Sequence, residues 1–287
     1  MGHDASAGDA TSIDARDCAC TFGAPTTVGI VANTEATELS GLATSRALAG
    51  TVWTHNDSGD TARLFAMGTD GASQGVLTIT GGMATDWEDL AIGPCGADRW
   101  CLYAADIGDN DLVRTRIRVY EIDEPTAISG TQAATARTFD VSYPDGAHDA
   151  EALFVDPRNG DTYVITKQTP PNAGTPSKVF LLPKSAMVAT AEEVGTLTIP
   201  TGNLLVTGAD LYADDCGVRL LVRTYTNVFQ LSGSPDSTIA GLLSATPTIV
   251  PVAPELQGEA VAWLPDGRGY LTVPEGSSAA ISRVACE

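Results

Sequence analysis

Residues 86–91 read DWEDLA, a short apolar strand entered through acidic residues, and this pattern recurs along the chain. Related segments are ELSGLA at 38–43, DAEAL at 149–153, TGADL at 207–211 and QGEAVA at 257–262. Their apolar markers are separated by 48, 63, 58 and 50 residues; they are Leu42, Leu90, Leu153, Leu211 and Val261. Repeats of this length are typical of four-stranded propeller blades with loop insertions.

Further apolar strands follow each recurrent segment. In the second repeat they are expected at 100–105, 117–122 and 138–141, whereas the last repeat stops after 280–284, one strand short. Residues 27–31 can supply that strand and thereby close the ring and protect its edges. We therefore predict an all-β fold, a β-propeller of five blades whose N-terminal strand closes the last blade. Six blades are the alternative, if residues 242–252 fold differently.

The first 24 residues are rich in Ala, Asp, Ser, Thr and Gly and show no periodicity. Such composition predicts a flexible leader over residues 1–24, of the kind that tethers a lipoprotein. Residues 25–287 are then expected to form a single propeller domain.

The formal net charge of the 287 residues is −20. A field of that sign repels phosphate backbones and attracts cations, so we expect no nucleic-acid partner. The alternative for most of these charges is a solvated acidic surface. No apolar run is long enough to cross a bilayer, so we expect no membrane span, and we expect a monomer.

Six cysteines without a CxxC motif predict three disulfides and an oxidising compartment, with six reduced core cysteines as the alternative. Cys95 and Cys101 flank a tight turn and are expected to pair. Four cysteines remain, Cys18, Cys20, Cys216 and Cys286, and we expect each of the last two to bond one of the first two. The protein is accordingly expected to be secreted, periplasmic or a surface-tethered lipoprotein.

Acidic residues occupy two columns of the repeat, two positions apart, so each pair projects to one side of its strand. Strand openings surround the central channel of a propeller, and carboxylates converging there need a cation or a shared proton. These columns predict metal ligands at Glu38, Asp86, Asp149, Glu88, Glu151 and Glu259.

Two Asp-x-Gly-Asp motifs follow the next strand, in HNDSGD at 55–60 and DIGDND at 106–111. Hard oxygen ligands around a glycine turn suit calcium. They add Asp57, Asp60, Asp106, Asp109 and Asn110 to the predicted metal ligands. The alternative is that these residues cap their own turns.

Later repeats carry Lys167, Arg223 and Glu275 at the position that we equate with these motifs. Lys167 and Arg223 are expected to bind an anionic group of a substrate, or else to form ion pairs between blades. His55 and His148 lie beside acidic motifs, so they are candidate catalytic bases, together with Glu88 and Glu151. Such histidines more often hydrogen-bond a loop.

The segments ELSGL at 38–42, WTHNDSGD at 53–60, DWEDL at 86–90 and DIGDN at 106–110 resemble secreted bacterial propeller proteins of uncharacterised function. More distantly, the chain is similar to the SdiA-regulated and esterase-like phytase propellers. The resemblance in architecture covers the chain from about residue 26 to the end. The specific motifs that match lie mainly in the first three repeats. It implies a calcium ion, held by Glu38, Glu88, Glu151 and Glu259, that binds a phosphate or carbonyl oxygen of the substrate.

These observations predict a calcium-dependent hydrolase of a phosphoester, ester or lactone. One alternative is a non-catalytic calcium-stabilised module that binds a glycan, a peptide or a surface partner. Another is a purely structural acidic ring, because propellers host all three roles.

Overall fold

The computed structural model describes residues 18, 20–169, 172–185 and 188–287. Over these residues the chain consists of strands and one short helix, α2 (Ile239–Leu243). The strands are β1 (Thr26–Ile30), β2 (Leu39–Thr44), β3 (Thr51–Asn56), β4 (Arg63–Gly68), β5 (Ser73–Thr80), β6 (Trp87–Gly96), β7 (Arg99–Asp106), β8 (Ile117–Asp123), β9 (Thr131–Ser142), β10 (Ala150–Val155), β11 (Thr162–Thr166), β12 (Ser177–Leu182), β13 (Ala189–Thr190), β14 (Glu192–Leu197), β15 (Val206–Asp214), β16 (Gly217–Thr224), β17 (Val228–Gly233), β18 (Thr248–Val250), β19 (Gly258–Trp263), β20 (Gly269–Pro274) and β21 (Ala280–Ala285).

Within the described residues the strands form three four-stranded sheets and one nine-stranded sheet. The four-stranded sheets have the orders β10-β11-β12-β14, β15-β16-β17-β18 and β1-β21-β20-β19. The larger sheet joins two antiparallel halves, β2-β3-β4-β5 and β6-β7-β8-β9, through parallel pairing of β5 with β9, which also pairs with β13.

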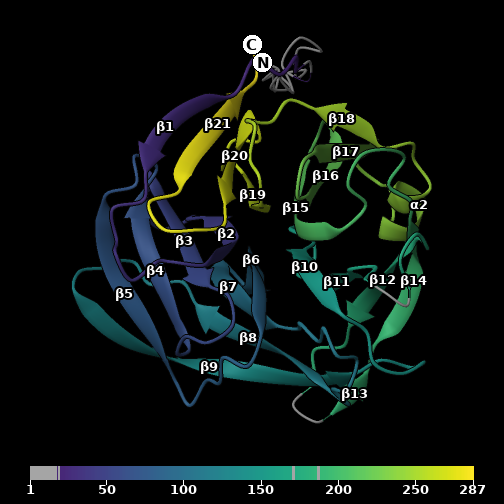
Figure 1. Ribbon diagram of the computed structural model, residues 1–287, viewed down its shortest axis with the longest axis horizontal. Coiled ribbons are helices and arrows are strands. Elements are labelled where there is room, and N and C mark those ends of the chain that lie inside the picture. The colour runs from purple at the N-terminus through teal and green to yellow at the C-terminus, as the bar shows by residue number, and fades with distance from the viewer. Residues whose placement is uncertain (1–17, 19, 170–171, 186–187) are drawn as a thin grey trace, which may run out of the picture.

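The strands nearest the centre are β2, β6, β10, β15 and β19, one from each four-stranded group (Figure 1). These innermost strands contact one another in the order β2, β6, β10, β15, β19, and β19 returns to contact β2. The all-β propeller architecture is therefore confirmed. Five blades follow if the two halves of the large sheet are counted separately, and the blade count stays a prediction. The 242–252 stretch, on which the alternative depended, contributes β18, which pairs with β17 as an outer strand.

The predicted closing strand is confirmed. β1 pairs antiparallel with β21, from Thr26 opposite Arg283 to Ile30 opposite Ala280. The first described strand thus completes the sheet that the last three strands begin, and β1 and β21 lie side by side in Figure 1.

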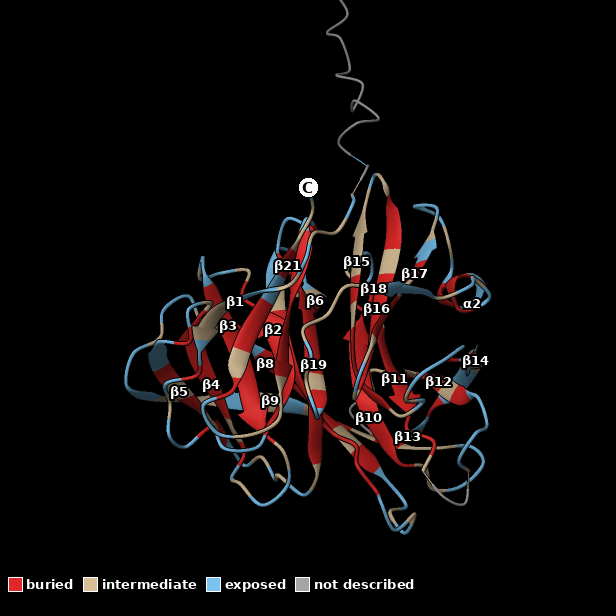
Figure 2. Cartoon of the chain, turned by 45° about the horizontal axis from the view of Figure 1, so that its top comes forward, coloured by how far each residue is buried: buried red, intermediate tan, exposed pale blue. Residues whose placement is uncertain are grey.

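The hydrophobic core lies between neighbouring sheets, and the inner strands are buried along most of their length (Figure 2). One cluster, for example, joins Phe154 of β10 and Val179 of β12 to Leu211 of β15 and Phe229 of β17. Because both faces of the inner strands are covered, every residue of β2 and β10 is buried. Burial of one Phe or Leu side chain stabilises by about 1.5–3 kcal/mol, so the packed sheet faces supply the main stabilisation.

Buried carboxylates connect the inner strands to one another. Asp210 of β15 accepts a hydrogen bond from the Trp263 N–H of β19, at 2.7 Å, and Asp89 of β6 accepts one from the Leu153 N–H of β10, at 2.8 Å. Burial raises the pKa of Asp89 well above its ordinary value and that of Asp210 to about 7. These hydrogen bonds link β15 to β19 and β6 to β10, and so help to hold the inner strands at fixed positions around the centre of the ring.

The three disulfides agree with the predicted pairing, and they resolve its open part as Cys18–Cys216 and Cys20–Cys286, beside Cys95–Cys101. Most of the predicted leader, residues 1–17 and 19, lies outside the described residues. Phe22, however, packs its ring against Tyr270 with 5.1 Å between centroids. Among the described helices, none has the length and apolar character needed to cross a membrane.

Candidate functional site

The register of strand pairing defines equivalent positions at the strand openings. The first pair in each group is Leu39–Asn56, Trp87–Asp106, Ala150–Thr166, Val206–Thr224 or Gly258–Pro274. Each inner strand therefore presents its next residue at the same level, and these residues are Ser40, Glu88, Glu151, Thr207 and Glu259. Each second strand is followed, at a second common level, by Asp57, Ile107, Lys167, Tyr225 and Glu275.

This register corrects two equivalences drawn from the sequence. Asp106 corresponds to Asn56, not to Asp57, because Trp87 pairs with Asp106 as Leu39 pairs with Asn56. Tyr225, not Arg223, corresponds to Lys167. The shared Asp-x-Gly-Asp letters misled the alignment, since backbone pairing and not side-chain identity determines the register.

Three predicted ligands, Asp57, Asp86 and Glu88, come together at one side of the central opening. Each offers a carboxylate oxygen, and these oxygens all lie within 4.8 Å of one another. We call these three residues the carboxylate cluster. Gly108 backs it closely, since a Cβ added there would lie 2.1 Å from Glu88 Oε1 and 2.5 Å from Asp86 Oδ2. A side chain at position 108 would therefore displace the cluster.

Burial and mutual repulsion raise the pKa values of the carboxylate cluster. Burial raises the pKa of Asp86 to about 6, and the charge of Asp57 adds to this shift. For Glu88, burial and the charges of Glu151 and Asp57 raise the pKa well above the ordinary value. A bound cation would relieve this repulsion, as would a proton.

Glu151 forms an ion pair with Lys167, one of the residues for which the sequence predicts a binding role. Lys167 Nζ forms a buried ion pair with Glu151 and donates a hydrogen bond to Tyr225 Oη at 2.8 Å. Burial alone would lower the pKa of Lys167, but the Glu151 carboxylate and the Tyr225 hydroxyl raise it above its ordinary value. The ammonium group therefore stays charged and bridges two neighbouring sheets.

Glu259 and Glu38 lie outside the cluster but act on its surroundings. Burial and the charge of Glu151 raise the pKa of half-buried Glu259 to about 8. Glu38 is exposed, and its carbonyl oxygen accepts a hydrogen bond from the Asp57 N–H at 2.7 Å. Its charge adds to burial and to the charge of Glu275 in raising the pKa of Asp57.

Several other predicted ligands are engaged in turns and ion pairs. Asp60 pairs with Arg63 at 2.9 Å, and Asp106 pairs with Arg114 at 2.8 Å. The Asp109 carboxylate accepts the Arg114 N–H at 2.7 Å, which closes its own loop. The Asp109 contact is the capping arrangement given above as the alternative to calcium binding, whereas Asp60 and Asp106 are engaged by arginine side chains.

Two further predicted ligands also lie apart from the cluster. Asp149 is buried and accepts the Asp109 N–H at 3.0 Å. Asn110 is exposed. The structure thus brings three of the predicted metal ligands within coordinating distance of one another.

The two candidate histidines do not join the carboxylate cluster. His55 is fully buried, lies edge-on against Trp87, and burial lowers its pKa to about 4, so it is neutral at pH 7. His148 Nε2 lies 2.8 Å from Asp145 Oδ1, and its ring packs against Phe180. Their predicted role as bases stays a prediction.

Arg223 has no exposed surface, although the sequence suggested contact with a substrate. Its Nη2 donates to Glu255 Oε2 at 2.6 Å, while Nε and Nη1 are buried without a partner in the described structure. The guanidinium lies so close to Gly258 that an added Cβ there would be 1.4 Å from Nη2. Arg223 thus anchors the loop that precedes β19. Glu255, like Tyr225, was not identified from the sequence.

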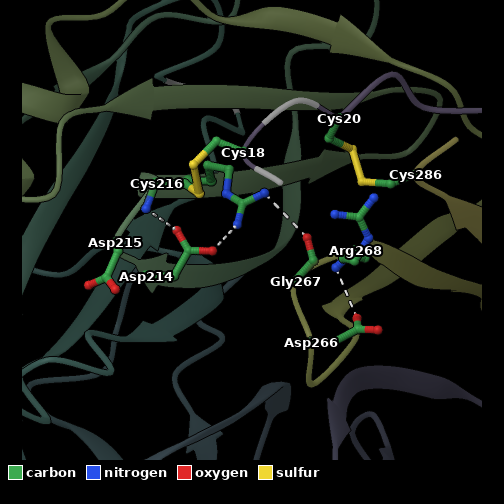
Figure 3. A pocket seen from close by; sticks show the side chains of 10 residues that line it. Cys18, Cys20, Asp214, Asp215, Cys216, Asp266, Gly267, Arg268 and Cys286 are labelled. Carbon is green, nitrogen blue, oxygen red and sulfur yellow. Dashed lines mark hydrogen bonds and ion pairs between the residues drawn. A yellow bond between two sulfur atoms is a disulfide. The ribbon is translucent and has the colours of Figure 1, made fainter. Parts of the chain in front are cut away.

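A cavity of about 450 Å³ lies at the opposite ends of the inner strands, between the β15–β16 and β19–β20 turns. Figure 3 shows the Cys18–Cys216 and Cys20–Cys286 disulfides beside it, with Arg268 N–H donating to Asp266. Arg219 spans it between Asp214, at 2.9 Å, and the Gly267 carbonyl. This cavity contains none of the predicted catalytic or metal residues.

Comparisons with known proteins place few constraints on this site. No family model matches the sequence, and no curated protein matches it. A structural-genomics protein of unknown function from Bacteroides thetaiotaomicron is similar in structure, with 12% identity, a TM-score of 0.45, and coverage of 92% of this chain and 76% of that one. The soluble aldose sugar dehydrogenase from Escherichia coli, in its apo form, has 12% identity, a TM-score of 0.48, and coverage of 93% and 100%.

Proposed function

We propose that this chain is an extracytoplasmic calcium-binding propeller that acts as a metal-dependent hydrolase of a phosphoester, ester or lactone. The observation that carries the proposal is the convergence of Asp57, Asp86 and Glu88 within 4.8 Å. Glu88 is 5% exposed, and its carboxylate lies close to those of Asp57 and Asp86. Like charges that are largely withdrawn from water are costly to hold together unless a cation or a proton neutralises them.

The ligand chemistry of the cluster fits calcium. Calcium takes six to eight hard oxygen ligands, and carboxylates supply them with compensating charge. Asp57, Asp86 and Glu88 would hold the ion, with water and ligand oxygens in the remaining positions. This set differs from the one that the family resemblance implied, because Glu151 is paired with Lys167 and Glu38 is exposed.

A bound calcium ion would supply Lewis-acid polarisation of a carbonyl or phosphoryl oxygen. The protein's own contribution would be to bind and orient the substrate beside it. Tyr225 Oη, which accepts the Lys167 hydrogen bond, retains its own proton for donation to an anionic oxygen of the substrate. Glu259, on inner strand β19, is the candidate group for accepting a proton from water, and the charge of a bound cation would favour the ionised carboxylate that this role requires.

The cellular location follows from the disulfides. Three disulfides indicate an oxidising, extracytoplasmic environment. Secretion or a surface lipid anchor is part of the proposal.

A second candidate function is a non-catalytic calcium-dependent module that binds a glycan or peptide. The observation in its favour is that His55 and His148 are both engaged away from the carboxylate cluster. The best candidate bases predicted from the sequence are then absent from the proposed reaction centre.

Calcium-dependent melting tests the cation site. We expect calcium to raise the Tm of the wild type, chelator to reverse the rise, and Glu88→Gln to abolish it. Asp140→Asn is a matched control, because Asp140 pairs with Arg118 between β8 and β9, away from the cluster. If the Tm of the wild type is the same with and without calcium, the proposed cation site is wrong.

A substrate panel then separates the two functions. Chromogenic phosphoesters, esters and lactones are assayed with calcium, with chelator and with Glu88→Gln. Turnover that is lost both with chelator and in the Glu88→Gln variant would support the hydrolase. Calcium stabilisation without turnover of any class would favour the binding module.

A further inference from the structure

A second group of carboxylates lies beside the carboxylate cluster. Glu88, Glu151 and Glu259 each follow the first pair of their inner strand, so they share one level of the central opening. β10, which carries Glu151, contacts β6, which carries Glu88. In addition to burial, the charge of Glu151 raises the pKa values of both Glu88 and Glu259, in agreement with this placement. Glu151 therefore interacts with the cluster on one side and with Glu259 on the other.

A cation already lies among these carboxylates, the ammonium group of Lys167. Its Nζ forms a buried ion pair with Glu151, and each of the two side chains is 7% exposed. The charge of Lys167 also opposes the rise in pKa that burial and neighbouring carboxylates cause at Asp57, Glu88 and Glu259. These three residues belong to three other strand groups, whereas Lys167 follows β11. The ammonium group therefore reaches towards the centre of the ring.

Contacts with the next sheet hold the ammonium group at this position. Nζ of Lys167 donates a hydrogen bond to Tyr225 Oη at 2.8 Å and lies 4.9 Å from the centroid of the Tyr225 ring. The Tyr225 carbonyl oxygen accepts the Gly258 N–H at 3.0 Å, which connects it to the start of β19. The charge is thus fixed by contacts from two sheets, unlike that of a flexible surface lysine.

An ammonium group and a calcium ion meet the same electrostatic requirement, because each neutralises carboxylates that would otherwise repel one another. In two-metal sites, the second ion binds an oxygen of the substrate together with the first. An ammonium group has three donors, and among the described residues Glu151 and Tyr225 accept two of them. The third donor is available to an oxygen of the ligand.

We propose that Lys167 is the resident counter-ion of Glu151 and Glu259 and takes the place of a second calcium ion beside the carboxylate cluster. The centre then pairs one calcium ion with one ammonium group, and a negatively charged oxygen of the ligand binds between the two. Lys167 determines how many metal ions the centre holds. This inference rests on the proposed cation site and specifies its metal content.

Equilibrium dialysis against calcium measures the metal content without requiring turnover. We expect the wild type to bind about one more calcium ion per chain than Glu88→Gln, which lacks a ligand of the cluster. Lys167→Met should bind about one more than the wild type, because loss of the ammonium group frees Glu151 and Glu259 as calcium ligands. The K167M/E151Q double variant removes both members of the ion pair and should bind as many ions as the wild type.

Lys178→Met is the matched control, since Lys178 also pairs with two carboxylates, Asp145 and Glu193, but at a more exposed position. It should bind as many calcium ions as the wild type. Equal binding by Lys167→Met and the wild type would overturn the inference and leave the cation site standing. So would a Lys167→Met protein that circular dichroism shows to be unfolded in saturating calcium, because a second ion should replace the lost charge.

The comparison of the wild type with Glu88→Gln distinguishes the other failure. If these two proteins bind calcium equally, the proposed function fails. An additional ion in Lys167→Met that is lost in K167M/E151Q would then still support Glu151 as part of a cation position that Lys167 fills. Absence of both differences overturns both proposals.

Discussion

The side chain of Asp89 accepts a hydrogen bond from the backbone N–H of Ala209 at 3.1 Å, although 120 residues separate them. The same oxygen, Oδ2, accepts the Leu153 N–H, and Oδ1 accepts the Leu90 N–H at 2.8 Å. One fully buried carboxylate therefore joins β6, β10 and β15. It fixes the distance between strands whose openings carry Glu88, Glu151 and Thr207.

Replacing Asp89 by Ala should weaken the whole ring. Three buried N–H groups would lose their acceptor, and each unsatisfied group costs about 1–3 kcal/mol. We expect the free energy of unfolding to fall by about 3 kcal/mol or more, measured by urea denaturation. Asp140→Asn, at a half-exposed ion pair, should change it by less than about 1 kcal/mol. Similar losses in the two variants would contradict the role given to Asp89.

His55 should make the protein sensitive to acid. Burial lowers its folded-state pKa from 6.5 to about 4, so below pH 6.5 the unfolded chain binds a proton that the folded chain does not. The His55 contribution to stability is therefore complete above pH 6.5 and declines towards pH 4, by up to about 3 kcal/mol. Urea denaturation at pH 7 and pH 4.5 of the wild type and His55→Gln measures it. If both proteins show the same pH dependence, His55 is not the group responsible.

Glu88→Gln should stabilise the calcium-free protein while it abolishes calcium binding. The folded-state pKa of Glu88 is raised, so the folded protein binds the extra proton above the unfolded value of about 4.5 and loses stability as the pH rises. A neutral amide removes that loss. We expect the variant, in chelator at pH 8, to gain about 1 kcal/mol, and the gain to vanish near pH 4. A destabilised variant at pH 8 would show that the carboxylate has a favourable partner.

The disulfides should contribute unequally to stability. Cys20–Cys286 spans 266 residues and Cys95–Cys101 spans 6. Loop-closure entropy predicts stabilisation of about 5 kcal/mol for the first and about 2 kcal/mol for the second. Serine pairs at each site, compared by urea denaturation, test the difference. Equal losses would mean that constraint of the unfolded chain does not dominate.

The repeated strand openings were predictable from sequence, because four-stranded units require similar hydrophobic segments at similar intervals. The Cys95–Cys101 disulfide was predictable, as was the bonding of Cys216 and Cys286 to the two N-terminal cysteines, since strand direction places Cys216 and Cys286 on one face of the ring. Which of Cys18 and Cys20 bonds which partner was not. The register was not. Asp106 belongs to the first pair of its strands whereas Asp57 follows the first pair of its own, so matching Asp57 to Asp106 by their letters shifts the alignment by one residue.

Tyr225 and Glu255 were not identified from the sequence, because each contacts a residue that is distant along the chain. Tyr225 reads as an ordinary aromatic residue near a strand end, and its significance depends on Lys167, 58 residues earlier. The Arg223–Glu255 pair likewise joins residues 32 apart, and nothing in the local sequence predicts it.

The pairing of β1 with β21 imposes an order on biosynthesis. Residues 26–30 are synthesised well before their hydrogen-bonding partner at 280–285. Until β21 has been made, β1 lacks the strand with which it pairs. The ring consequently closes only once both segments are present, and the Cys20–Cys286 disulfide then joins the two closing segments covalently.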